Sequence, residues 1–148
     1  MKITHMLVAT DLSQETTACI APIADLARSV GARITLLHVL ETLEVIPRGA
    51  AFAPPLEFDS AKTADSARGQ LEERRSGFGP GIELSVDVVT GGDIAEAITA
   101  YAGAHDVDLI AVATHGRTGF RHLVLGSVAE GVIRRSTVPV LVLPRPKS

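Results

Sequence analysis

The chain has 148 residues, of which 46% are apolar and 21% are charged, and its formal net charge at pH 7 is −3. This length suits a single domain with a sizeable core, which we expect to span residues 1–148. No apolar run approaches the roughly 18 residues of a membrane-spanning helix, and the scattered basic residues and few aromatic residues argue against nucleic-acid binding.

The N-terminus and the single cysteine indicate the compartment. Residues 1–5 lead directly into a strand-like run, without the apolar segment and cleavage site of a secretory signal. Cys19 has no second cysteine for a disulfide or a metal site, the histidines show no metal-site spacing, and a helical context is typical of a small packing cysteine. We therefore expect a cytoplasmic protein without a metal site.

Apolar runs of strand length alternate with stretches of helical periodicity along the chain. In chain order they predict a strand at Ile3–Ala9, a helix at Gln14–Val30, a strand at Arg33–Val39, a helix at Leu56–Gly77, a strand at Ile82–Val89, a helix at Ile94–His105, a strand at Leu109–Ala113, a helix at Val128–Arg135 and a strand at Val138–Leu143. Such alternation requires crossover connections. We therefore predict a doubly wound α/β fold, a five-stranded parallel sheet with helices on both faces.

The polarity of the strands predicts their order. Met6–Ala9 and Leu109–Ala113 are apolar throughout, as in central strands, whereas Ile82–Val89 alternates with polar residues, as in an edge strand. The order 3-2-1-4-5 satisfies these patterns. In that order the helices after the first and fourth strands diverge to opposite faces and open a crevice. We therefore expect the ligand site after Ala9 and after Ala113.

Helix caps and breakers set the expected boundaries. Ser13 and Asp93 can cap helices, Gly31 can close the first helix, and Pro22 should kink that helix or shift its start. The segment Thr42–Asp59 contains three prolines and has no clear periodicity. We expect it to be a lid, a partner surface or a disordered loop.

The segment after the fourth strand carries the most informative pattern. Gly116 and Gly119 permit close backbone approach, and Gly126 and Ser127 open the last helix. The free amides and positive dipole of that helix start, with the Ser127 hydroxyl, describe a phosphate cradle. Such a loop also serves turning alone, and neither GxxxxGK[ST] nor GxGxxG is present.

A second loop, Ala9–Ser13, leaves the neighbouring predicted strand. It brings the carboxylate of Asp11 beside the phosphate cradle, where it could accept hydrogen bonds from ribose hydroxyls. The alternative is a turn and helix-cap role for Asp11 and Ser13. The two loops together favour a nucleotide crevice.

Four segments of the chain resemble the universal stress protein family. They are Thr10–Ser13, Thr114–Gly119, Leu125–Glu130 and Pro139–Val142, and the resemblance extends over essentially the whole chain. It implies a Rossmann-like domain of the adenine nucleotide alpha hydrolase type, ATP binding and a role in stress response. The nucleotide contacts that it implies are adenosine contacts from Thr10 and Asp11, an adenine pocket wall from Val39, and phosphate contacts from Gly116, Gly126, Ser127 and the backbone of Val128.

Members of this family that bind ATP carry the pattern G-x₂-G-x₉-G-[ST]. Gly116, Gly126 and Ser127 match it, but Ala113 occupies the position of the first glycine. The Ala113 methyl group could crowd the nucleotide and weaken binding. Family members often have a proline at the position of Ala9, and this chain does not. The difference lies on the side of the crevice that is expected to contact the adenine base.

We expect a non-catalytic module that binds ATP, ADP or AMP, with or without Mg²⁺. A slow ATPase and a stress-linked interaction dimer that binds no nucleotide stay open as alternatives. ATP hydrolysis needs a base and compensation of the charge on the phosphates, and the glycine loop has no lysine. His115 could act as a base, and Arg117 and Arg121 could bind phosphate. The alternative for all three is an ordinary structural role in the loop. A receiver domain would need a phospho-accepting aspartate after the third strand, where Thr90 and Gly91 stand.

Self-association is expected from the last strand. In the predicted order, Val138–Leu143 is an exposed apolar edge, which proteins normally cover or pair. A homodimer joined along this strand is the simplest solution, and the family resemblance implies the same arrangement.

Overall fold

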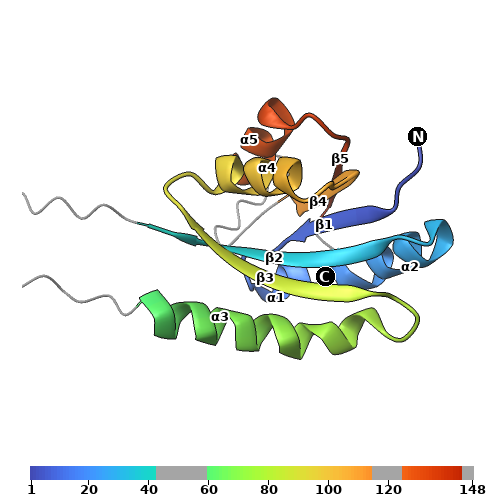
Figure 1. The fold of residues 1–148 in the computed structure, drawn as a ribbon, viewed down its shortest axis with the longest axis horizontal. Coiled ribbons are helices and arrows are strands. Elements are labelled where there is room, and N and C mark those ends of the chain that lie inside the picture. The colour runs from blue at the N-terminus through green and yellow to red at the C-terminus, as the bar shows by residue number, and fades with distance from the viewer. Residues whose placement is uncertain (43–59, 115–124, 145–148) are drawn as a thin grey trace, which may run out of the picture.

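The computed structural model describes residues 1–42, 60–114 and 125–144. Strands and helices alternate along them (Figure 1). The elements are β1 (His5–Ala9), α1 (Gln14–Thr17), α2 (Ile20–Val30), β2 (Arg33–Glu41), α3 (Ser60–Arg75), the 3₁₀ turn η1 (Ser76–Phe78), β3 (Leu84–Gly91), α4 (Ile94–Ala104), β4 (Leu109–Ala113), α5 (Ser127–Arg135) and β5 (Val140–Leu143). The loop predicted after Thr42 and residues 56–59 of the second predicted helix lie outside the described residues. None of the described helices is long and apolar enough to cross a membrane.

The five strands form one parallel sheet in the order β3-β2-β1-β4-β5, which confirms the predicted fold class and strand order. β1 lies at the centre, where Leu7 is opposite Thr35 of β2 and Ile110 of β4. The first four residues of β1 and of β4 are buried. This burial explains why both strands are apolar throughout, because helices cover both faces of the central sheet.

Two apolar cores lie on opposite faces of the sheet, because successive side chains of a strand point to opposite faces. Met6 and Val8 belong to the core covered by α2 and α3, and Leu7 belongs to the core covered by α4 and α5. Figure 1 shows α4 and α5 above the sheet and α3 below it. The chain therefore leaves β1 toward one face and β4 toward the other.

Pro22 divides the first predicted helix into α1 and α2. It is the third residue of α2, a position whose backbone amide has no partner within the helix, so the missing N–H of proline costs little there. The predicted shift of the helix start is confirmed. The predicted caps are also confirmed, at Ser13 before α1, at Asp93 before α4 and at Gly31, which closes α2 with φ 71°.

Three strands start two residues later than predicted, at His5, Leu84 and Val140. The Thr4 amide donates to the Asp108 carboxylate (2.8 Å) instead of to a neighbouring strand. Pro139 has no amide hydrogen to donate. The hydrophobic periodicity of a strand does not show where a backbone amide bonds a side chain or lacks a hydrogen, so it does not predict where the pairing of strands begins.

Side chains occupy the outward backbone groups of the edge strand β3. The contacts are Arg75 to the Leu84 carbonyl (2.6 Å), Arg68 to the Val86 carbonyl (3.4 Å) and the Val88 amide to Asp87 Oδ1 (2.8 Å). Arg68 also pairs with Asp87 (3.4 Å), and the Tyr101 hydroxyl of α4 donates to the other oxygen of Asp87 (2.9 Å). These contacts occupy three of the outward backbone groups with which another strand would pair, and so oppose pairing at this edge.

A buried polar chain joins three strands near their amino ends. His5 is 4% exposed, and its Nε2 lies 2.8 Å from the Thr35 hydroxyl, which lies 3.0 Å from the Ser85 hydroxyl. His5 Nδ1 lies 3.0 Å from the His105 carbonyl. Burial, and next the positive charge of Arg33, lower the pKa of His5 below its ordinary value of 6.5. Folding therefore favours the neutral imidazole.

We expect the free energy of unfolding to decrease as the pH falls below 6.5. In that window the unfolded chain takes up a proton at residue 5 before the native protein does, so protonation favours unfolding. Urea denaturation at a series of pH values measures this slope. In His5→Gln, which keeps polar atoms but does not titrate, the slope should be smaller; an equal slope in both proteins would contradict the assignment.

Candidate functional site

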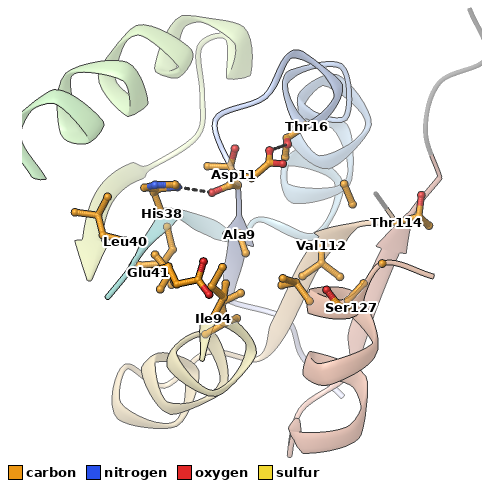
Figure 2. Close-up of a pocket in the computed structure, with 18 residues that line it drawn as sticks. Ala9, Asp11, Thr16, His38, Leu40, Glu41, Ile94, Val112, Thr114 and Ser127 are labelled. Atoms are coloured by element: carbon orange, nitrogen blue, oxygen red, sulfur yellow. Dashed lines mark hydrogen bonds between the residues drawn. The ribbon is translucent and has the colours of Figure 1, made fainter. Parts of the chain in front are cut away.

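A cleft opens at the carboxyl ends of β1 and β4, the place that the strand order predicts (Figure 2). Its volume is about 520 Å³, and its walls come from the ends of β1, β2 and β4 and from the start of α5. All but one of the predicted site residues line it, namely Thr10, Asp11, Val39, Ala113, Gly126, Ser127 and Val128. The exception, Gly116, lies outside the described residues, as do His115, Arg117 and Arg121.

The loop after β1 holds Asp11 in a defined position. The Thr10 amide donates to the Leu37 carbonyl of β2 (2.9 Å), and the Leu12 amide donates to the Thr10 hydroxyl (3.0 Å). Leu12 itself has φ 65°, in the left-handed region that side chains other than glycine rarely adopt. The chain therefore turns sharply immediately after Asp11.

The two carboxylate oxygens of Asp11 differ in their surroundings. Oδ1 accepts hydrogen bonds from the Ser13 amide (3.0 Å) and the Thr16 hydroxyl. Oδ2 is buried and has no hydrogen-bond partner among the described residues. Burial alone would raise the pKa of Asp11, but the hydrogen bonds from Ser13 and Thr16 outweigh it and hold the pKa below the ordinary value. At neutral pH the carboxylate is therefore ionised, and Oδ2 is left to accept a hydrogen bond.

The opposite wall is the start of α5. Gly126 is the N-cap residue, its amide donates to the Thr114 carbonyl (2.6 Å), and it has no side chain with which to cap the first turn. Ser127 and Val128 follow it on the wall of the cleft. A helix start of this kind presents amide hydrogens and a partial positive charge, which together attract anions. Figure 2 shows Ser127 across the cleft from Asp11 and Thr16.

Apolar residues form one part of the cleft wall. Val39 of β2 is 7% exposed, and Leu37, Ile98 and Val112 line the same space. Ala113 also lines it, so the methyl group that replaces the first glycine of the family pattern lies on the wall. The arrangement combines an apolar pocket, a carboxylate acceptor and a helix start that attracts anions.

Sequence reasoning did not predict four polar residues as part of the site, Thr16, His38, Glu41 and Thr114. The Thr16 hydroxyl donates to Asp11, and His38 Nδ1 lies 2.8 Å from the Thr10 carbonyl. Glu41 stands at the end of β2 and lines the cleft. The available signal was the strand order: β2 neighbours β1, so its last residues reach the same edge. No group of potential metal ligands occurs among the described residues.

Residues 2–144 match the model of the universal stress protein family. The chain belongs to this family. The universal stress protein MJ0577 of Methanocaldococcus jannaschii is 28% identical over 156 aligned positions, which cover 97% of this chain and 96% of that protein. The solved structure of MJ0577 superposes with a TM-score of 0.78 at 25% identity and covers both chains completely.

Two other universal stress protein structures superpose on this one and contain adenine nucleotides. One is a complex with cAMP, with a TM-score of 0.66, 19% identity, and coverage of 97% of this chain and 98% of the other. The second is the complex of an Archaeoglobus fulgidus protein with dAMP, with a TM-score of 0.58, 21% identity, and coverage of 96% and 98%. At these identities the likeness establishes a shared fold.

Replacing Thr16 with valine should raise the pKa of Asp11. The variant keeps the shape of the side chain but removes the hydroxyl that donates to Oδ1, so the ionised carboxylate loses a stabilising hydrogen bond. NMR titration of the Asp11 carboxyl carbon measures the shift. Thr99→Val is the matched control, because its hydroxyl bonds only the Ala95 and Glu96 carbonyls of its own helix. An unchanged Asp11 pKa in Thr16→Val would show that this hydrogen bond does not hold the carboxylate ionised.

Proposed function

We propose that this universal stress protein binds an adenine nucleotide, ATP in the first place, in the cleft between β1 and β4, and that it acts in the stress response as a binding module. The observation that carries the proposal is the pairing of two groups across one cleft. One is the buried Asp11 Oδ2, which has no partner among the described residues, and the other is the start of α5, whose N-cap residue Gly126 has no side chain to bond the first amides. A ribose hydroxyl suits the first, and a phosphate suits the second.

The nucleotide would lie with its ribose at Thr10 and Asp11 and its base against Val39. Its phosphates would accept hydrogen bonds at Gly126, Ser127 and the Val128 amide, and the family pattern adds Gly116. Mg²⁺, where present, would accompany the phosphates. The cleft volume of about 520 Å³ falls within the range of small-molecule sites.

The choice of an adenine base rests on the apolar wall and on the family. Val39, Leu37 and Ile98 provide apolar surface against which a purine ring would lose water, and structures of this fold exist with cAMP and dAMP. We place residues 1–148 in one domain, and the cytoplasmic location stays a prediction of the sequence.

Binding without turnover is the reading we favour, and a slow ATPase is the alternative. Hydrolysis requires a positioned water, a base and compensation of the charge that develops on the phosphates. Asp11 uses Oδ1 to hold its own loop. An ATPase role would require turnover above that of mock-purified material, and that turnover would have to disappear in Asp11→Ala.

We also propose a homodimer joined along β5. The carbonyls of Pro139 and Leu143 accept from Ile110 and Thr114, so the intervening residues 140 and 142 direct their backbone groups away from the sheet. All four residues of β5 are only partly buried. The contrast with β3, whose outward groups bond to side chains, supports pairing at β5.

Calorimetric titration with ATP and Mg²⁺ should detect binding by the nucleotide-free protein. Micromolar affinity corresponds to about −8 kcal/mol. Gly126→Asp should weaken it at least about tenfold, or about 1.4 kcal/mol, because the new carboxylate repels phosphate and caps the amides. The Gly126 φ of −63° suits a side chain, and aspartate is a favoured N-cap residue, so the variant should fold.

Two further variants separate the possible causes of a change in ATP affinity. Gly126→Asn caps the same amides without a charge, so the excess loss in Gly126→Asp measures repulsion of the phosphates. Ala113→Gly removes a methyl group from the wall and should bind ATP more tightly than the native protein. If only Ala113→Gly binds, the native cleft has lost its ligand, and the interaction dimer without nucleotide becomes the better description.

Sedimentation velocity should give the mass of a dimer for the native protein. Val142→Pro removes an amide hydrogen that points away from β4 and leaves the ladder between β4 and β5 in place, so we expect a folded monomer. Circular dichroism checks that the variant keeps its secondary structure. A native protein that sediments as a monomer, or a Val142→Pro variant that still forms dimers, would contradict pairing at β5.

A further inference from the structure

Arg74 of α3 reaches the loop that carries Asp11. Its guanidinium donates from Nη2 to the Leu12 carbonyl, from Nε to the Thr17 hydroxyl (3.2 Å) and from Nη1 to the Gln70 carbonyl of its own helix (2.9 Å). Arg74 is half-buried, whereas the neighbouring Arg75 is exposed. One side chain thus ties α3 to the turn after β1 and to the end of α1.

The residue that Arg74 holds, Leu12, has an unfavourable backbone conformation. Leu12 has φ 65°, and a leucine gains nothing from this conformation by itself. Two hydrogen bonds hold its backbone there, the one from its amide to the Thr10 hydroxyl and the one from Arg74 to its carbonyl, while its side chain packs against the apolar core. Of the two hydrogen bonds, the one from Arg74 comes from outside the loop.

The second contact of Arg74 acts on the other side of Asp11. The Thr17 hydroxyl accepts from Arg74 and donates to the Ser13 carbonyl (3.0 Å). Thr17 also directly follows Thr16, whose hydroxyl donates to Asp11 Oδ1. Both groups that hold Oδ1, the Ser13 amide and the Thr16 hydroxyl, therefore lie in the segment that Arg74 fixes.

We propose that Arg74 is a positioning residue for the nucleotide site: its guanidinium holds Leu12 in the left-handed conformation and the end of α1 in place, and thereby keeps Asp11 Oδ2 available to the ligand. This inference rests on the proposed function and deepens it. The planar guanidinium of Arg74 is required because it bonds two acceptors from different segments at once, the Leu12 carbonyl and the Thr17 hydroxyl. The single ammonium group of a lysine does not reproduce this geometry.

The test is ATP affinity in the native protein, Arg74→Ala, Arg74→Lys and Arg75→Ala. Both Arg74 variants should bind ATP about tenfold more weakly, because the hydrogen bond to Asp11 is misaligned. Arg75→Ala is the matched control on the same helix; Arg75 bonds Glu72 and the Leu84 carbonyl, away from the cleft, and its loss should leave affinity unchanged. Native affinity in Arg74→Lys would overturn the proposal, because the charge alone would then suffice.

A double-mutant cycle with Asp11→Asn separates positioning from general destabilisation. If Arg74 acts through Asp11, replacing Arg74 should cause little further loss of affinity once Asp11 is asparagine. Equal losses in both backgrounds would overturn the proposal. Thermal unfolding of Arg74→Ala and Arg75→Ala, measured in parallel, shows whether the two variants differ in stability.

A measurement without nucleotide distinguishes failure of this inference from failure of the proposed function. NMR titration of Asp11 should give a higher pKa in Arg74→Lys than in the native protein, because the hydrogen bonds to Oδ1 loosen while the charge is kept. If no protein binds ATP and the pKa still rises, the nucleotide proposal fails and the positioning role stands. If the pKa does not move, the positioning role is overturned.

Discussion

The adjacency of β1 and β4 is the constraint on which the rest of the structure depends. Each of these parallel strands must connect by a crossover, and the connections leave toward opposite faces of the sheet. No helix can then cover the space between the two carboxyl ends. The cleft, the turn that carries Asp11 and the exposed start of α5 are all consequences of this one reversal in the winding of the chain.

The two walls of the cleft reach their polarity by different means. At α5 the charge is a property of the backbone, and Gly126 contributes by having no side chain that would satisfy the first amides. At β1 the charge is that of Asp11, and the surroundings keep it ionised although it is partly buried. The first wall needs only a helix of sufficient length, whereas the second depends on several precise hydrogen bonds, which makes it the more sensitive to substitution.

Much of the architecture follows from patterns that the sequence contains. The uninterrupted apolar runs of β1 and β4 identify the central strands, and the polar alternation before Val89 identifies the edge, so the strand order and the place of the cleft could be predicted. The late starts of β1 and β5 could not, because an aspartate carboxylate and a proline determine them locally.

The residues of the site also fall into two groups, those that the sequence predicts and those that it does not. Thr10, Asp11, Gly126 and Ser127 follow strands or open a helix and could be found by their positions in the chain. Thr16, His38 and Arg74 could not, because their roles come from contacts between elements far apart in the sequence. The left-handed conformation of Leu12 was equally hidden, since leucine is not a residue that favours it.

The unequal edges of the sheet limit how many copies of the chain can associate. A two-fold pairing at β5 would use the open edge of each copy and join the two sheets into one that ends in β3 on both sides. There Arg68, Arg75 and Asp87 already bond the outward carbonyls of Leu84 and Val86 and the outward amide of Val88, so a third chain finds these three groups of that edge already occupied. These three side chains, which stabilise a peripheral strand, therefore also oppose the growth of filaments. The protein can expose one unpaired edge strand without the polymerisation that two unpaired edges would allow.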